Sequence, residues 1–405
     1  MPDKPKESDL VSHPALIPVE RWSPFTAEVL ADPACAHQAL LAQCPVHHCQ
    51  DFDPPFFTLS RYADVEQALR DIDTFSSQFG QGPRFTEPQG MLCDPPQHTA
   101  MRQLVQPAFT PRQMAALRPR VTELCTELLD KQPTVFDIHD DFAFPLPVLI
   151  IADLLGIPTD DLEQFKYWSD VQVAAMGSAD PSIYADDQAA FFNYMRHALR
   201  SRREAIRKQH SVPDDLLSLI AGAQDPEGGF ISEADAQSML QQLLVGGNET
   251  TTSLITNMVW RLLQEPKLYA EVAANPQLIS AVVEESLRFD PPVLGLYRNT
   301  TRDVEIHGVH IPTGSKVYMN YAAANRDPEV FANPDRFDPK RAAKRHLGFG
   351  LGVHFCLGAP MARLEAEIAL AQLVQKLPEL KLLGSGERIT PFFLWGRRKL
   401  PVSCS

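Results

Sequence analysis

Residues 348–358 read GFGLGVHFCLG, and the segment that follows, APMARLEAEIALAQLVQKL, has strong helical character. Cys356 therefore lies at a loop-to-helix junction, where unpaired amide groups and the positive end of the helix dipole favour the thiolate that a metal needs. Gly350, Gly352 and Gly358 allow the backbone to approach a flat group closely and to direct N–H donors at sulfur. The stretch predicts a thiolate metal ligand. The alternative for a lone cysteine is a buried, inert side chain beside a tight turn.

The longest helical pattern in the chain, residues 232–264, has a polar break in its middle. Ser232 provides an N-cap for this helix, which would span roughly 50 Å at 1.5 Å per residue. Gly246 and Gly247 each cost about 1 kcal/mol relative to alanine in a helix, and polar and β-branched residues follow at 248–252. Such local conflicts are typical of functional sites. The alternative is a kinked helix whose threonines bond back to their own carbonyls.

Apolar residues recur at helical spacing over most of the chain, and shorter alternating runs predict strands. The alternating runs at 304–311 and 316–322, joined through Pro312 and Gly314, predict a small antiparallel unit. The expected fold class is therefore mainly α with a minor β-sheet region. We expect one domain over residues 1–405, of which residues 1–20 form an extended arm. The expected helices cover residues 114–129, 162–176, 186–208, 232–264, 276–289 and 359–377.

Composition and charge narrow the class of function. The chain has 405 residues, 44% of them hydrophobic, which is enough for a large core. A formal net charge of -14 argues against a nucleic acid partner and favours a small-molecule ligand. Seven scattered cysteines are typical of reduced thiols, and the first 18 residues lack the pattern of a signal peptide or a membrane anchor. A soluble, cytoplasmic protein is expected.

The cysteine loop FGLGVHFCLG, at residues 349–358, resembles position for position the haem-binding loop of the cytochrome P-450 superfamily of haem-thiolate monooxygenases. The resemblance implies a cytochrome P-450 fold with haem b (iron protoporphyrin IX) between the long central helix and the cysteine loop and its helix. It makes Cys356 the axial ligand of the haem iron, whose electron-rich sulfur favours cleavage of bound dioxygen. Phe349 would pack near the sulfur, and Gly358 would also contact the cofactor.

The polar break GGNETT is similar to the oxygen-binding groove of the same superfamily. By that resemblance Gly246 and Gly247 make room above the iron. Glu249 and Thr250 are then the catalytic acid and alcohol pair that delivers protons.

The resemblance covers nearly the whole chain and assigns two further groups of residues. Haem carries two propionates, whose burial requires cationic or donor partners. The expected propionate ligands are His98, Arg102, Arg298 and His354. A structural group is expected from Glu285 and Arg288, which share one helix face, together with Arg336 of the later sequence NPDRFDP.

The implied reaction transfers one atom of O2 to a hydrophobic small molecule and releases the other as water. Electrons would come from a ferredoxin, itself reduced by a NAD(P)H-dependent ferredoxin reductase. One alternative is a haem-thiolate peroxygenase driven by hydrogen peroxide, against which the intact Glu249 and Thr250 pair argues. A non-catalytic haem sensor or carrier is the alternative from another class. Candidate ferredoxin contacts are Arg102, Arg112, Lys344, Arg345 and Arg363.

The substrate pocket is expected to be predominantly apolar, with Gln242 as a polar anchor. This favours a terpenoid, aromatic or steroidal substrate of modest size. The expected lining residues are Phe85, Met91, Leu92, Met176, Gln242, Val245, Leu294, Leu296, Phe393 and Leu394.

Overall fold

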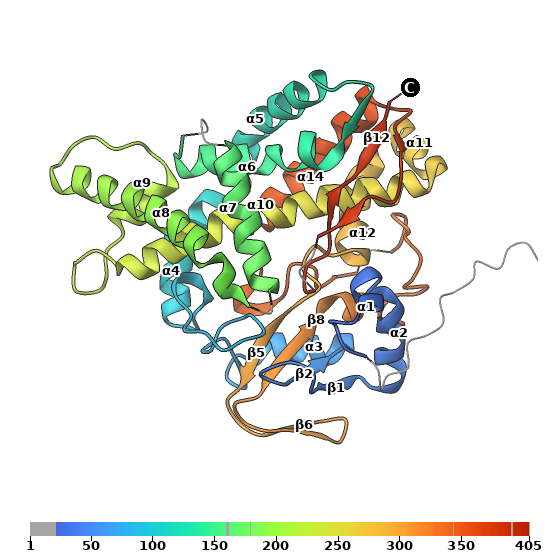
Figure 1. Cartoon of the computed structure of the whole chain (residues 1–405), viewed down its shortest axis with the longest axis horizontal. Helices are drawn as coiled ribbons and strands as arrows, with labels where there is room; N and C mark the ends of the chain where they lie inside the picture. Colours follow the sequence, from blue (N-terminus) through green and yellow to red (C-terminus); the bar gives the residue numbers. More distant parts are fainter. Residues whose placement is uncertain (1–21, 159–161, 179, 343, 390–391, 405) are drawn as a thin grey trace, which may run out of the picture.

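The computed structural model describes residues 22–158, 162–178, 180–342, 344–389 and 392–404, so the expected N-terminal arm lies outside the described residues. The chain is mainly α-helical, and its larger sheet lies to one side of the helices (Figure 1). No helix in the described part of the chain is both long enough and apolar enough to cross a membrane. The helices are α1 (Ala27–Ala31), α2 (Ala34–Gln43), α3 (Tyr62–Arg70), α4 (Gln97–Val105), α5 (Pro111–Asp130), α6 (Pro145–Leu155), α7 (Leu162–Gly177), α8 (Ala185–Arg207), α9 (Leu216–Gly222), α10 (Glu233–Gln264), α11 (Pro266–Ala274), α12 (Ile279–Phe289), α13 (Tyr321–Ala324) and α14 (Ala359–Lys376).

Helix α10 crosses the centre of the molecule and packs against α6, α8, α12 and α14 (Figure 1). The Ser232 hydroxyl accepts a hydrogen bond from the backbone N–H of Asp235 at 2.9 Å, so the helix begins at the predicted cap. Residues 251–259 are buried on every face of the helix, polar side chains such as Thr252 and Asn257 included, which places its C-terminal half in the core. The long helix predicted over residues 232–264 is therefore confirmed.

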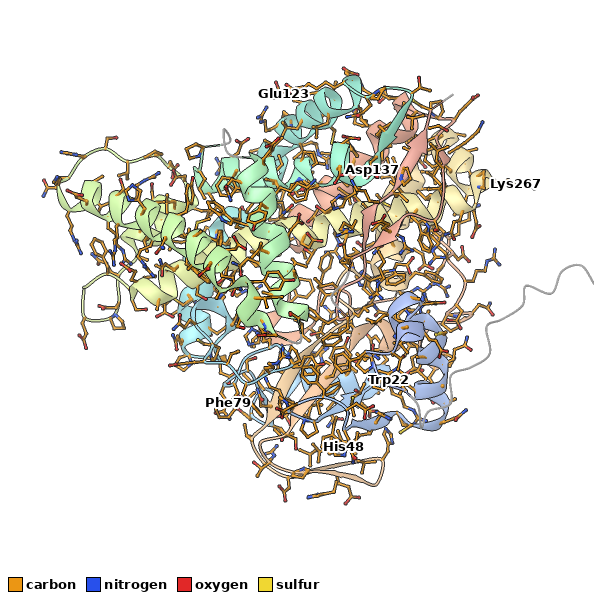
Figure 2. The ribbon with its side chains drawn as sticks, in the orientation of Figure 1. Trp22, His48, Phe79, Glu123, Asp137 and Lys267 are labelled. Atoms are coloured by element: carbon orange, nitrogen blue, oxygen red, sulfur yellow. The ribbon has the colours of Figure 1, made fainter. Side chains whose placement is uncertain are left out.

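The principal sheet has five strands in the order β1-β2-β8-β5-β3, with bounds Val46–Cys49, Phe56–Leu59, Lys316–Asn320, Gly295–Thr300 and Phe75–Ser76. A three-stranded sheet has the order β4 (Val135–Asp137), β12 (Pro401–Ser403) and β9 (Lys381–Leu382). A two-stranded sheet pairs β10 (Glu387–Arg388) with β11 (Arg397–Lys399). Apolar side chains from the helices form one large core, and a second core lies under the principal sheet. Charged side chains such as Glu123 and Lys267 lie at the outer edge, whereas Trp22 is buried (Figure 2).

The predicted antiparallel unit of residues 304–311 with 316–322 is wrong. Residues 304–311 instead pair with themselves, as strands β6 (Val304–Ile306) and β7 (Val309–Ile311). His307 and Gly308 turn this hairpin with φ of 50° and 76°, the left-handed conformation that two-residue hairpin loops require. Strand β8 pairs with β5 and, in parallel, with β2, partners that are distant in sequence.

The structural ion pair on α12 is buried and includes a different arginine from the one expected. Arg288 donates to both carboxylate oxygens of Glu285, at 2.8 and 2.7 Å. The third guanidinium belongs to Arg341, whose Nε lies 3.3 Å from Glu285. Arg336 was the predicted partner, but its side chain is exposed and only its carbonyl oxygen accepts, from Arg288 and Arg341. The prediction therefore named an arginine five residues too early in the chain.

Candidate active site

A cavity of about 310 Å³ lies between the middle of α10 and the cysteine loop, where the sequence predicted the cofactor. Both predicted halves of the site therefore face one space. Its walls from α10 and the loop include Gly246, Gly247, Thr250, Phe349, His354, Cys356 and Gly358. Its remaining wall includes Leu296 and Arg298 of β5.

The cysteine loop holds its sulfur at this cavity by its own backbone hydrogen bonds. The Cys356 N–H donates to the Phe349 carbonyl at 3.0 Å, which closes the loop. Burial raises the pKa of the Cys356 thiol, while the N–H groups of Gly358 and Ala359 and the nearby charge of Arg102 lower it. A coordinating metal ion deprotonates a thiol outright. The pKa of the Cys356 thiol is raised overall, so a bound cation rather than the loop itself stabilises the thiolate. Phe349 forms part of the same wall, with the Arg363 guanidinium 4.6 Å from its ring centre.

The loop conformation also depends on glycine. Gly352 has φ of +74°, and a Cβ there would lie 2.4 Å from the Leu69 carbonyl oxygen. A Cβ on Gly246 or Gly358 would meet no atom within 4 Å, although both residues line the cavity. The two walls therefore leave open space between them, as a flat ring system would require.

Four basic side chains gather beside the cavity, and none of them forms an ion pair with a carboxylate in the described part of the chain. Arg298 is buried on β5, and the His98 and His354 rings lie 4.3 Å apart, centre to centre. Arg102 donates to the Val353 carbonyl at 3.3 Å. The nearest carboxylate, Asp94, already accepts from the backbone N–H of Ser77 at 2.8 Å and from the Ser76 hydroxyl.

The basic groups lower one another's proton affinity. Burial and then the charges of Arg298 and His98 lower the pKa of His354 to about 2. Burial and then Arg102 lower the pKa of His98, whose buried Nδ1 has no hydrogen-bond partner among the described residues. Buried cations without counter-ions are costly, so this cluster is suited to an anionic occupant. The propionates of haem fit it, and the residues present therefore fit the cofactor that the sequence implied.

The predicted alcohol, Thr250, lines the cavity, whereas the predicted acid, Glu249, does not. Thr250 lines the cavity, and its hydroxyl donates to the Gly246 carbonyl at 2.7 Å. The back-bonded threonine that was the alternative interpretation is therefore present, at a residue that also faces the site. Glu249 is buried, and burial followed by the neighbouring charge of Asp170 on α7 raises its pKa to about 7. Asn248 donates to the Ser169 hydroxyl at 3.0 Å, which fixes α7 against α10 at this level.

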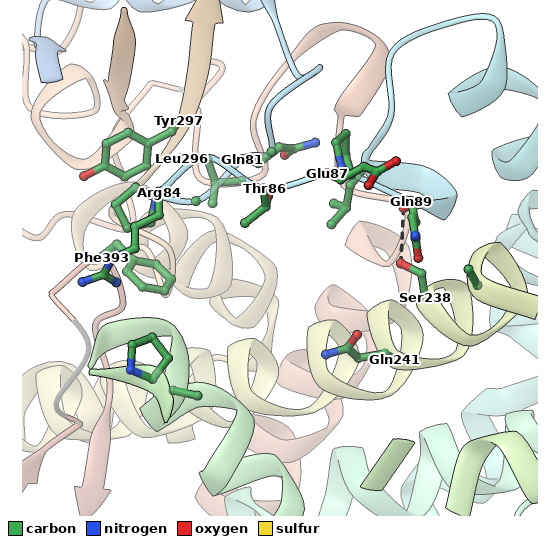
Figure 3. A pocket seen from close by; sticks show the side chains of 18 of the residues that line it. Gln81, Arg84, Thr86, Glu87, Gln89, Ser238, Gln241, Leu296, Tyr297 and Phe393 are labelled. Carbon is green, nitrogen blue, oxygen red and sulfur yellow. Dashed lines mark hydrogen bonds between the residues drawn. The ribbon is translucent and has the colours of Figure 1, made fainter. Parts of the chain in front are cut away.

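A larger cavity of about 620 Å³ adjoins the inner one and shares Gln81, Leu92 and Leu296 with it. Figure 3 shows its walls, with Ser238 and Gln241 on α10 facing Leu296 and Phe393 across the space. Of the predicted pocket residues, Leu92, Leu296 and Phe393 line these cavities.

The other predicted pocket residues lie elsewhere. The Gln242 amide accepts from the Met91 N–H at 3.1 Å and donates to the Gln89 carbonyl at 2.9 Å, so it anchors a loop rather than substrate. Leu294 faces a different cavity, described below. Phe85 is exposed, and the side chain of Met176 lies outside the described part of the chain. Met91, Val245 and Leu394 contribute to the hydrophobic core instead.

Sequence reasoning missed the polar face that α10 presents to the outer cavity. Ala234, Gln237, Ser238 and Gln241 line it at the three- and four-residue spacing of one helix face. This periodicity was available in the sequence. Gln242 does not line this cavity, because its amide donates to the Ser238 hydroxyl at 2.6 Å and to the Gln89 carbonyl. The contributions of Ala175 and Phe192 depend on the docking of α7 and α8 and carry no local signal.

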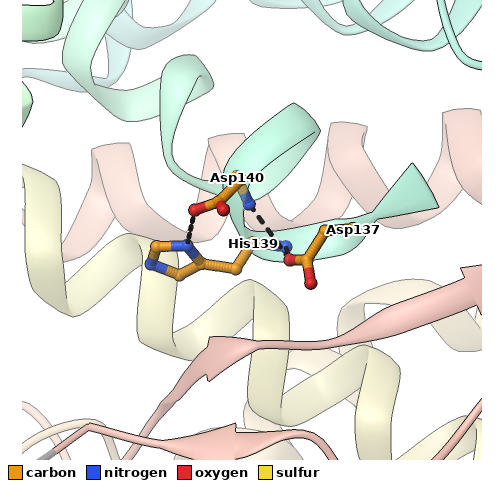
Figure 4. Close-up of side chains that lie close together, drawn as sticks. All are labelled: Asp137, His139 and Asp140. Carbon is orange, nitrogen blue, oxygen red and sulfur yellow. Dashed lines mark hydrogen bonds and ion pairs between the residues drawn. The ribbon is translucent and has the colours of Figure 1, made fainter.

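A second group of metal-ligand residue types lies far from the cysteine loop in the sequence. Asp137, His139 and Asp140 have side-chain ligand atoms within 4.8 Å of one another (Figure 4). Their acceptors are already used: Asp137 accepts from three backbone N–H groups, and Asp140 pairs with His139, Lys166 and Lys399. The hydrogen bonds to Asp140 outweigh its burial and keep its pKa low. The group is therefore a structural ion-pair network.

Comparison with known proteins yields concordant results. The cytochrome P-450 family model matches residues 178–382. The chain is 39% identical over 375 residues to the vitamin D(3) 25-hydroxylase of Pseudonocardia autotrophica, covering 90% of this chain and 91% of that protein. It is 39% identical over 351 residues to the erythromycin C-12 hydroxylase of Saccharopolyspora erythraea, covering 84% and 87%. A cytochrome P-450 from Bacillus megaterium, solved in complex with testosterone, superposes with a TM-score of 0.83 at 31% identity, covering 94% and 100%.

The fold and the cysteine-centred cavity define an oxidoreductase with a thiolate-ligated cofactor. The similarities extend over most of the chain and over the site itself. The chain belongs to the cytochrome P-450 family and is an oxygen-incorporating enzyme. The predicted superfamily and its fold are thereby confirmed.

Proposed function

We propose that this protein binds haem b in the inner cavity and hydroxylates a hydrophobic molecule held in the outer one. The observation that supports this most strongly is one cavity lined by both the Cys356 thiol and Arg298, a buried cation that forms no ion pair with any carboxylate among the described residues. Cys356 ligates the iron, and His98, Arg102, Arg298 and His354 hold the propionates. Gly246, Gly247, Phe349 and Gly358 shape the walls around the cofactor.

The haem, when bound, supplies the reductive activation of O2 and the transfer of one oxygen atom to substrate. The chain supplies protons in a pocket that otherwise excludes water. We assign that role to Glu249 and Thr250. A carboxyl with a pKa near 7 both holds and releases a proton at neutral pH, and the Thr250 hydroxyl can exchange its bond to the Gly246 carbonyl for one to a water.

The substrate we propose is bulky, largely hydrophobic and carries at least one hydrogen-bonding group. The outer cavity, about 620 Å³, is large enough for a steroid-sized molecule and has mainly apolar walls. Gln237 and Gln241 line its α10 side, and their amide N–H groups already donate to the Phe192 carbonyl at 3.3 Å and to Gln172 at 3.2 Å. Their amide oxygens are therefore the groups that a substrate donor would meet. The names of relatives that hydroxylate vitamin D(3) and erythromycin, and of one crystallised with testosterone, support this class.

The proposed electron donor is a ferredoxin served by a NAD(P)H-dependent reductase. We also propose a cytoplasmic location and a single catalytic domain. Arg112, Lys344 and Arg345 are exposed, so they are available to an acidic partner. Arg363 is held by Glu284 at 2.6 Å and is therefore a weaker candidate.

The decisive experiment measures oxygen incorporation. Purified enzyme is supplied with a ferredoxin, its reductase and NAD(P)H, after steroid-sized compounds have been screened for shifts of the haem spin state. The proposal expects 18O from 18O2 in the product. Product formed only when hydrogen peroxide is added would indicate a peroxygenase. Carbon monoxide binding without any product would indicate a sensor or carrier. Cys356→His is expected to abolish the red-shifted carbon monoxide band.

A further inference from the structure

A second cavity, unrelated to the haem site, lies on the other side of residues 291–294. Its volume is about 440 Å³, and it shares no lining residue with the inner cavity. Pro292 and Val293 line the inner cavity, whereas Pro291 and Leu294 line this one. We call it the arginine cavity, because its walls include Arg261, Arg326, Arg388 and Arg397, together with Trp260 and Trp395.

Two of the four arginines are neutralised by the protein. Arg261 makes a bidentate pair with Asp290, at 2.9 and 3.2 Å. Arg326 is paired with Asp335 at 2.9 Å, outside the cavity wall. The other carboxylate in the wall, Asp32, accepts from the Ala34 N–H at 3.1 Å at the start of α2.

Arg388 and Arg397 pair with no carboxylate in the described part of the chain. The Arg388 guanidinium donates to the Leu394 carbonyl at 3.1 Å, a neutral acceptor. Burial and then the charge of Arg397 lower the pKa of Arg388 to about 10. Burial and, to a smaller extent, Arg261 lower the pKa of Arg397 to about 10, while the carboxylates of Asp290 and Asp32 raise it. Asp32 also raises the pKa of Arg388, and both guanidinium groups remain charged at neutral pH.

Four buried donors without acceptors belong to side chains that line this cavity. Among the described residues, Nε of Arg388, Nε of Arg397, Nε1 of Trp260 and Nε1 of Trp395 are buried and have no hydrogen-bond partner. Each such donor costs about 1–3 kcal/mol when buried and unsatisfied. Arginine and tryptophan side chains only donate, so the occupant that satisfies them must be an acceptor.

The aromatic rings hold the arginines in place. The Arg397 guanidinium lies 3.7 Å from the centre of the Trp260 ring and 4.9 Å from that of Trp395. Arg388 lies 4.6 Å from the Trp395 ring centre. The two guanidinium groups are therefore fixed before a ligand arrives, which reduces the entropy cost of binding.

We propose that the arginine cavity binds a small organic dianion, a dicarboxylate or a phosphate monoester. Arg388 and Arg397 form no direct ion pair among the described residues, although the charges of Asp32 and Asp290 offset part of theirs. Two guanidinium groups side by side favour the forked geometry of carboxylate or phosphate. The volume exceeds that of an inorganic ion, so the ligand carries an organic body. Only Pro291–Leu294 separates this ligand from the haem cavity, so the site is distinct from the substrate pocket but adjacent to it.

Isothermal titration calorimetry on the haem-loaded protein tests the proposal. Inorganic phosphate and succinate serve as probes, each compared with sodium chloride at equal ionic strength. We expect saturable binding of a dianion at one site per chain. The probe that binds more tightly identifies the phosphate or the dicarboxylate as the preferred class. Arg397→Gln and Arg388→Gln should each weaken that binding at least tenfold, which corresponds to about 1.4 kcal/mol.

The matched control is Arg398→Gln, since Arg398 is the next residue of β11 but is exposed and paired with Glu387. It should leave dianion affinity within a factor of two. Each variant must keep the carbon monoxide band of a haem thiolate, which shows that it is folded and loaded with haem. If Arg397→Gln does not fold, Arg388→Gln alone tests the proposal. Heats no larger than those of chloride, or equal losses in Arg398→Gln and Arg388→Gln, would overturn the proposal.

Discussion

At the scale of single residues, the hydroxyl of Thr250 links the structure of α10 to the chemistry of its cavity. It bonds back to the Gly246 carbonyl while lining the haem cavity, so its removal leaves the walls nearly unchanged. We expect Thr250→Ala to bind substrate and consume O2, but to yield roughly tenfold less product per O2 consumed, with the balance released as hydrogen peroxide. Product and peroxide are measured against oxygen uptake.

Two variants control this prediction. Thr250→Ser keeps the hydroxyl and should restore most of the coupling. Thr252→Ala removes a hydroxyl that donates to the Ala143 carbonyl at 3.1 Å, away from the cavity, and should leave coupling unchanged. If Thr250→Ala couples oxygen to product as well as the parent enzyme does, the threonine only shapes the helix.

Glu249 supplies the pH dependence expected of the same site. Its pKa of about 7, raised by burial and then by Asp170, means that the carboxyl is mostly protonated below pH 7 and mostly ionised above it. A proton donor acts in its protonated form, so turnover should fall as pH rises through about 7. Glu249→Gln should turn over roughly 10²-fold more slowly and lose this inflection. An unchanged inflection in the variant would assign the titration to another group.

At the scale of elements, the buried ion pair on α12 shows where a sequence motif stops being informative. Glu285 and Arg288 share a helix face, which local spacing predicts, and the structure contains the pair. Arg341 joins it after a turn at Asn333 that no spacing rule encodes. The Glu285 carboxylate thus faces two guanidinium groups in a buried setting.

Substitution of Arg341 and of Arg336 should affect stability differently, because only the Arg341 side chain contacts Glu285. Arg341→Leu leaves Glu285 with one cationic partner and frees carbonyl groups at Asn333 and Arg336. We expect it to lower the free energy of unfolding by about 3 kcal/mol. Arg336→Leu, which removes an exposed side chain, should change it by less than about 0.5 kcal/mol. Denaturant unfolding of both variants is the measurement, and equal losses would contradict the assignment.

The same distinction explains how much of the molecule the sequence revealed. The N-cap of α10, the loop around Cys356 and the helix after it follow from local chemistry, and they were predicted to within a residue or two. The partners of β8 and the residues opposite α10 in the outer cavity depend on contacts between distant segments. The sequence predicted Gln242 as the polar anchor of the pocket, whereas Gln241 lines the outer cavity. Helical periodicity groups residues into faces, but it does not show which face meets the cavity.

At the scale of the whole molecule, the core between α5 and α14 contains an ionisable group that opposes folding at high pH. Glu365 on α14 is fully buried, and neither of its carboxylate oxygens has a partner among the described residues. Burial raises its pKa to about 8. It packs near Cys125 of α5, whose pKa is raised by its own burial and then by Glu365. Helices α5 and α14 therefore pack around a carboxyl group that must stay protonated for the fold to keep its full stability.

Linkage fixes the sign of the effect on stability. Because the folded pKa of Glu365 lies above the unfolded value near 4.5, its contribution is fully present below about pH 4.5 and is lost as pH rises through about 8. Glu365→Gln removes this titration, so its advantage over the parent should grow with pH, reaching on the order of 5 kcal/mol above pH 8. Glu367→Gln, on the half-buried side of the same helix beside Arg118, should change stability by less than about 1 kcal/mol throughout. Denaturant unfolding at pH 6 and pH 9 compares the three proteins. A difference between Glu365→Gln and the parent that does not increase between those values would show that water reaches the carboxylate, and that the core between α5 and α14 is open.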